Sequence, residues 1–165
     1  MKTRAIVVGL LLCALMVSGA MCQSSANIQT PKVSQVPSGW YQTANDAYDP
    51  TIGYGLVEYT DNWDGDFVQI FYGPVPASLK GKEGDSNALI AQAVSEAIFS
   101  PDDTGPMTVA GRLAGYAEAY DDYWEWWETE IVFVYGDTYV DIYTVYNSTV
   151  SDIQEATNLI ESIYF

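Results

Sequence analysis

The residues best suited to chemistry are two glutamates, Glu128 and Glu130, in the run WEWWETEIVFVYG. A strand would place both side chains on one face, about 6.6 to 7 Å apart by strand rise. The two carboxylates of a glycosidase can have such a separation. Acids two residues apart are also common on exposed strands, so the spacing alone is weak. We predict that the protein is not an enzyme and leave catalysis by paired carboxylates open.

Several other kinds of site are excluded by residue type. The chain has no histidine, which removes Ser-His and Cys-His nucleophiles and histidine-based zinc sites. Beyond the first 21 residues the only cysteine is Cys22, so we expect no disulfide and no thiolate metal site. The segment Gly81-Lys82-Glu83-Gly84 lacks the spacing of a phosphate-binding loop.

One loop is rich in the oxygen ligands that calcium prefers. Asp61, Asp64 and Asp66 lie within six residues, between two strand-like runs. The spacing is not that of an EF-hand, because Tyr72 stands where the bidentate glutamate would be. Calcium is therefore the one cofactor we consider, and an ordinary polar hairpin loop is the alternative.

The first 22 residues have the features of a signal peptide. Lys2 and Arg4 precede an uncharged apolar run, and small residues follow near Ala20. Cleavage after Ala20 would release the protein, whereas Cys22 could instead become a lipidated first residue. We predict an extracellular or cell-envelope location, with membrane contact only through the leader or a lipid anchor.

The charge of the chain limits its partners. The sequence carries 22 acidic and six basic residues, a net charge of −16. Two of the basic residues, Lys2 and Arg4, belong to the leader, so the remainder has four basic residues against 22 acidic ones, or −18. Such a field repels nucleic acids and anionic membranes. It also suits a well-solvated, secreted surface.

We predict one folded domain over residues 40–165, after a polar tether at 23–39 that carries Pro31 and Pro37. Alternating residues indicate a hairpin of strands at 54–60 and 67–73. A helix is expected over 87–99. A three-stranded antiparallel meander fills 107–147, and a capping box of Thr149 and Asp152 starts a closing helix.

Two turns set the expected register of the meander. A two-residue turn at Gly136-Asp137 places Phe133 opposite Val140. A turn at 121–123 would place Leu113 opposite Ile131. The small side chains of the strand at 111–120, which are Gly115, Ala117 and Ala119, then leave a trough for Trp127 or for a helix.

The other face of the meander combines aromatic rings with carboxylates, and we expect Arg112 to pair with Glu130 there. The residues of this face are Tyr116, Glu118, Trp124, Trp126, Glu128, Glu130, Tyr139, Asp141 and Tyr143. The candidate binding residues among them are Trp124, Trp126, Glu128, Glu130, Asp141 and Tyr143. The alternative is that a helix covers this face and that the rings fill the core.

The order of these elements resembles the PsbP-like fold, which is named for an extrinsic subunit of the photosynthetic oxygen-evolving complex and is shared by exported lipoproteins. The similarity runs from Gly39-Trp40 through the helix at 87–99 and the strand at 111–115 to the ending Ile160-Glu161-Ser162-Ile163-Tyr164-Phe165. It implies an α+β domain, an α/β/α sandwich around a central antiparallel sheet. It also implies a binding or assembly role outside the membrane.

The predicted function is therefore an exported, non-enzymatic binding or assembly domain that contacts a protein partner or a cation. The alternative is a carbohydrate-binding or carbohydrate-active envelope protein, because aromatic plates beside carboxylates suit a glycan. Asn147-Ser148-Thr149 is an N-glycosylation sequon. Its use depends on the organism.

Overall fold

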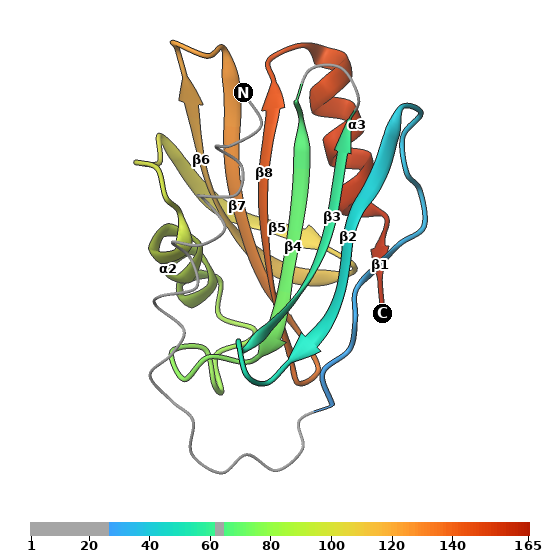
Figure 1. The fold of residues 1–165 in the computed structure, drawn as a ribbon. Helices are drawn as coiled ribbons and strands as arrows, with labels where there is room; N and C mark the ends of the chain where they lie inside the picture. The colour runs from blue at the N-terminus through green and yellow to red at the C-terminus, as the bar shows by residue number, and fades with distance from the viewer. Residues whose placement is uncertain (1–26, 62–64) are drawn as a thin grey trace.

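The computed structural model describes residues 27–61 and 65–165. Its centre is a seven-stranded antiparallel sheet with the order β2-β3-β4-β8-β7-β6-β5 (Figure 1). The strands of this sheet are β2 (Trp40–Asp49), β3 (Tyr54–Asp61), β4 (Phe67–Pro74), β5 (Asp103–Val109), β6 (Arg112–Asp121), β7 (Trp126–Tyr135) and β8 (Thr138–Asn147). A second, two-stranded sheet joins β1 (Lys32–Val33) to β9 (Ile163–Tyr164). Part of the segment predicted as a tether thus packs on the domain.

Two helices lie in the described part of the chain, one against each face of the large sheet (Figure 1). α3 (Val150–Glu161) buries Leu159 and Ile160 in a core with Val68, Ile70 and Ile142. α2 (Ser86–Glu96) buries Leu89 and Ala93 in a smaller core on the other face. The smaller core is completed by Leu79, Ala117, Val132, Val134 and Tyr139.

The helix termini follow from their capping residues. The Asp85 side chain accepts hydrogen bonds from the backbone N–H groups of Asn87 and Ala88 and so starts α2. The predicted cap of the closing helix is confirmed, because the hydroxyl of Thr149 accepts from the N–H of Asp152 at 3.3 Å. α2 ends at Glu96, three residues before the predicted end.

The predicted α/β/α sandwich is wrong. Strands make up 49% of the described residues and helices only 17%, so the fold is β-rich. A single short helix on each face does not form a helical layer over a sheet of seven strands. The two outer strands, β2 and β5, are not predicted from the sequence, and they make the sheet wider than the predicted sheet.

The β7–β8 pairing is confirmed, since Phe133 lies opposite Val140 as the two-residue turn requires. The predicted β6–β7 pairing is wrong. Tyr116, and not Leu113, lies opposite Ile131. This shift of three residues exchanges the two faces of β6, because side chains alternate along a strand.

The exchange of faces moves three predicted residues. Tyr116 packs against the core on the α3 side of the sheet. Glu118 lies opposite Thr129, whose hydroxyl donates to it at 3.4 Å. Arg112 does not reach Glu130: its guanidinium carbon lies 4.9 Å from the centre of the Tyr135 ring, a cation–π contact.

The trough predicted along β6 exists and holds a helix. At Gly115 a Cβ atom would overlap the backbone of Leu89 and Ile90 in α2. Ala117 and Ala119 continue this face of β6, and both are buried. The absence of a side chain at Gly115 therefore sets how closely α2 approaches the sheet.

We expect Gly115→Ala to lower the free energy of unfolding by about 1–3 kcal/mol, because a methyl group would push α2 away from β6. Urea unfolding followed by tryptophan fluorescence measures this change. Gly84→Ala is the matched control, because a Cβ at Gly84 meets no atom within 4 Å. Equal stabilities of the two variants would contradict the close packing of α2.

Candidate functional site

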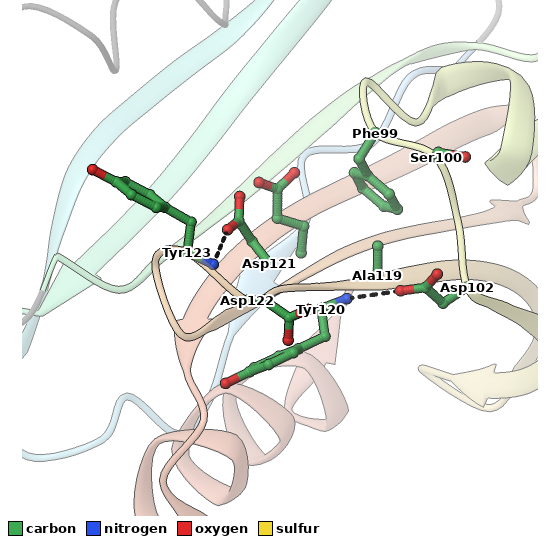
Figure 2. A pocket seen from close by; sticks show the side chains of 9 residues that line it. Phe99, Ser100, Asp102, Ala119, Tyr120, Asp121, Asp122 and Tyr123 are labelled. Atoms are coloured by element: carbon green, nitrogen blue, oxygen red, sulfur yellow. Dashed lines mark hydrogen bonds between the residues drawn. The ribbon is translucent and has the colours of Figure 1, made fainter.

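A hollow with a volume of about 460 Å³ lies where β6 runs into β7. One wall is the tip of this hairpin, and the other is the segment that follows α2 (Figure 2). Its lining residues are Phe99, Ser100, Asp102, Ala119, Tyr120, Asp121, Asp122, Tyr123 and Glu128. Two parts of the chain that are far apart in sequence thus form one site.

Asp121 fixes the hairpin tip. One of its carboxylate oxygens, Oδ1, accepts hydrogen bonds from the backbone N–H groups of Tyr123 at 2.8 Å and Trp124 at 3.0 Å. The N–H of Glu125 donates to the Asp121 carbonyl, and Glu125 adopts a left-handed backbone with φ of 59°. These bonds close a tight turn at a residue type that rarely takes this conformation.

The turn presents aromatic rings to solvent. Tyr123 is 81% exposed and Trp124 is 45% exposed. The two rings meet edge to face at 4.8 Å, and Trp124 stacks on Trp126 at 5.5 Å with 21° between the ring planes. Flat, rigid rings beside a hollow form a contact surface that loses little conformational entropy on binding.

The lining of the hollow is acidic and contains neither lysine nor arginine. Its four carboxylates belong to Asp102, Asp121, Asp122 and Glu128. Asp102 accepts from the N–H of Tyr120 at 3.3 Å, and Glu128 accepts from the Tyr143 hydroxyl at 3.3 Å. Burial raises the pKa of Glu128, and the hydrogen bond from Tyr143 only partly offsets this rise. The site can attract a cation and contact its apolar part through Phe99 and Tyr123.

The predicted binding residues do not form one exposed surface. Trp124, Trp126 and Glu128 lie at or beside the hairpin tip. Glu130 and Asp141 are fully buried, and Tyr143 is 4% exposed. Glu128 and Glu130 share a face of β7, as predicted, but only Glu128 reaches the hollow.

Most residues that line the hollow are not among the predicted binding residues. The sequence predicts only a turn at Asp121, Asp122 and Tyr123. The run Asp121-Asp122-Tyr123-Trp124 nevertheless combines charge and aromatic rings in four residues, a pattern that could have indicated a binding site. No such pattern marks Phe99 and Asp102, because they reach the site only through the packing of α2.

The predicted calcium ligands have other partners in the described residues. Asp66 is 4% exposed, and its Oδ1 accepts from the backbone N–H of Asn147 at 3.0 Å and from its side-chain Nδ2 at 2.9 Å. Asp61 accepts from the N–H of Gly65. Asp64 falls outside the described residues. Within residues 27–61 and 65–165, no three acidic or cysteine side chains converge as metal ligands. Calcium binding stays a prediction.

Two other predicted positions concern modification. Cys22 and the signal peptide lie outside the described residues. Asn147 ends β8, and its Nδ2, the atom that a glycan would modify, donates to Asp66. Neither helix of the described residues is long and apolar enough to cross a membrane.

Comparisons with known proteins inform the fold alone. No protein-family model matches the chain, and no curated protein matches it. A crystal structure from Bacteroides thetaiotaomicron at 1.50 Å resolution is similar, with a TM-score of 0.51 and 12% sequence identity over 82% of this chain. The match covers 47% of that structure, so the chain spans about half its length. At this identity the similarity shows a shared fold and carries no function, and it does not bear on the PsbP-like resemblance.

We expect Asp66→Ala to destabilise the protein by about 1–3 kcal/mol, because it leaves two part-buried donors of Asn147 without their acceptor. Chemical unfolding in the presence of a chelator measures this effect without any contribution from calcium. Glu161→Ala, an exposed change of the same charge, is the control. If millimolar calcium raises the melting temperature of the wild type but not of Asp66→Ala, the aspartate also binds calcium. A stability loss in Asp66→Ala no greater than that in Glu161→Ala would contradict the structural role.

Proposed function

We propose that this protein is an exported, non-enzymatic binding domain that holds a positively charged side chain of a protein partner in the hollow at the β6–β7 tip. The observation that supports this most directly is the lining of the hollow, with four carboxylates, three aromatic rings and no basic residue. A lysine or arginine side chain has a charged end for the carboxylates and an apolar stem for the rings.

The charge of the whole chain supports the same partner. A net charge of −18 beyond the leader attracts basic proteins over a long range and accelerates their association. The aromatic rings of Tyr123 and Trp124 would then supply contacts that long-range charge does not. Export rests on the leader sequence, and it places the partner in the cell envelope or outside the cell.

The test uses residues 23–165 and two short capped peptides, Gly-Arg-Gly and Gly-Gln-Gly, titrated by NMR. We expect the arginine peptide to shift the backbone amides of Asp102 and of residues 119–123, with the glutamine peptide inactive. The double variant Asp102→Asn, Asp121→Asn should abolish these shifts, because each asparagine keeps its acceptor oxygen for the turn but loses its charge.

The matched control is Asp137→Asn, Glu161→Gln, which changes the net charge equally at two exposed positions away from the hollow. It should bind like the wild type at the same salt concentration. Equal loss of binding in both double variants would show that only the overall charge attracts the peptide. Shifts spread over the whole surface would reject the hollow as a binding site.

A second candidate function is carbohydrate binding, which the exposed rings of Tyr123 and Trp124 and the stack of Trp124 on Trp126 favour. Aromatic rings stack on the apolar face of a sugar ring, while nearby carboxylates accept from its hydroxyl groups. A glycan array separates this function from the first. We expect binding of a neutral glycan to fall at least tenfold in Trp124→Ala if the stack holds a sugar, and no binding by the wild type would exclude it.

Any glycan that binds on the array can also be tested as a substrate, to determine whether the paired carboxylates of Glu128 and Glu130 catalyse its hydrolysis. If the protein only binds, neither the wild type nor Glu128→Gln nor Glu130→Gln should hydrolyse these glycans. Hydrolysis by the wild type that is lost in Glu128→Gln would contradict the non-enzymatic proposal.

A further inference from the structure

Two carboxyl groups are buried side by side on the α2 face of the sheet. Glu130 of β7 and Asp141 of β8 both have no exposed surface. In the β7–β8 register Glu130 lies opposite Tyr143 and Asp141 opposite Val132, so the two acids are diagonal neighbours on one face. None of their four oxygens receives a hydrogen bond from another kind of side chain.

The groups around this pair offer no positive charge. From α2, Glu96 faces both acids, and Gln92 lies beside Tyr139. From β8, Tyr139 and Tyr143 approach them. On the neighbouring strands, Ala117 of β6 lies opposite Glu130 and Phe71 of β4 opposite Asp141. Glu128 is a further carboxylate linked to this set, through its hydrogen bond from Tyr143.

A buried pair of like charges needs either a cation or a proton. The described residues form no group of three ligands that could hold a metal ion. A proton is sufficient, because a protonated carboxyl can donate to the other and satisfy both. The arrangement is that of two acids sharing one proton.

The pair is connected to the hollow by two short routes. Glu96 is the last residue of α2, and Phe99 and Asp102, three and six residues later, form one wall of the hollow. The N–H of Asp102 donates to the Glu118 carbonyl of β6 at 2.8 Å. On the other side, Tyr143 lies opposite Glu130 and donates to Glu128, which also lines the hollow.

We propose that Glu96, Glu130 and Asp141 form a proton-controlled latch: a proton shared by Glu130 and Asp141 keeps the end of α2 seated on the sheet, and its loss releases that end together with the Phe99–Asp102 wall. The latch does not depend on what the hollow binds. When the pair is fully ionised, two buried negative charges face that of Glu96, which is half-buried at the end of α2. The last turn of the helix has no basic residue to offset these charges.

The direction of the pH effect follows from the folded state. Burial raises the pKa of Asp141 to about 7, with the charge of Glu96 adding to the shift and the hydrogen bond to Glu130 opposing it. Burial and the charge of Asp141 raise the pKa of Glu130 well above its ordinary value, and burial raises that of Glu96. Because these pKa values are raised on folding, the stabilisation is complete in acid and falls as the pH rises through about 7, where Asp141 ionises and Glu130 keeps the shared proton. The remaining stabilisation is lost at higher pH, as that proton dissociates.

The first test is backbone hydrogen exchange of residues 23–165 from pH 5 to pH 9, corrected for the intrinsic exchange rate. We expect protection of the last turn of α2 to fall about tenfold for each pH unit above about 7, while α3 stays protected. The double variant Glu130→Gln, Asp141→Asn, which keeps the size of both side chains, should remove most of the pH dependence of the α2 protection. Constant protection of α2 in the wild type would overturn the latch.

The control is Glu118→Gln, because burial also raises the pKa of Glu118, but its side chain lies on the other face of β6. This variant should keep the wild-type pH dependence of α2. A second measurement covers the case in which the double variant does not fold. Infrared difference spectra of the wild type should show a protonated carboxyl band at pH 6 that loses intensity as the pH rises through about 7, and the absence of that band would also overturn the proposal.

Discussion

The close contact between α2 and β6 at Gly115 is the constraint on which this face of the molecule depends. A β-carbon at Gly115 would overlap the helix backbone, so at this point the backbone of α2 lies directly on the strand. That position fixes two other features. It brings Glu96 over the centre of the sheet, where it faces Glu130 and Asp141, and it directs the chain after Ala97 back toward the hairpin tip. The hollow and the buried acids therefore share one cause.

The parts of the fold that local chemistry determines were predicted from the sequence. The two-residue turn at Gly136-Asp137 fixed the β7–β8 register, because such a turn allows only one pairing of its strands. The preceding turn is longer, since Asp121 and Trp126 are the last pair of β6 and β7. An assumed three-residue turn shifted the register by an odd number and so assigned Tyr116 and Glu118 to the wrong face.

The two outer strands carry weaker signals. β2 has the sequence WYQTANDAYD and is exposed along most of its length, so no alternation marks it. β5 contains Gly105 and Pro106, which an outer strand tolerates because one side of it makes no sheet hydrogen bonds. Without these strands, the predicted sheet is smaller than the observed one, and the helices make up too large a share of the predicted fold.

The candidate site could be predicted only in part, for two physical reasons. Trp124, Trp126 and Glu128 are local to one hairpin, whereas Phe99 and Asp102 reach it only because α2 packs on Gly115. The acids of β7 and β8 seemed suited to a solvated surface, since charged residues are rarely buried. Burial reverses this interpretation for Glu130 and Asp141, and only the position of β8 between β4 and β7 determines it.

The lack of histidine gives the buried acids a further significance. In most proteins histidine is the side chain that changes charge between pH 5 and pH 8. This chain has none, so a response to neutral pH depends on carboxyl groups whose pKa is raised. Nine of the ten residues of β8 are buried, and an apolar side chain at position 141 would fill the same space without a charge to neutralise. Two acids that share a core with no basic residue are therefore costly as packing and better explained as groups that exchange a proton.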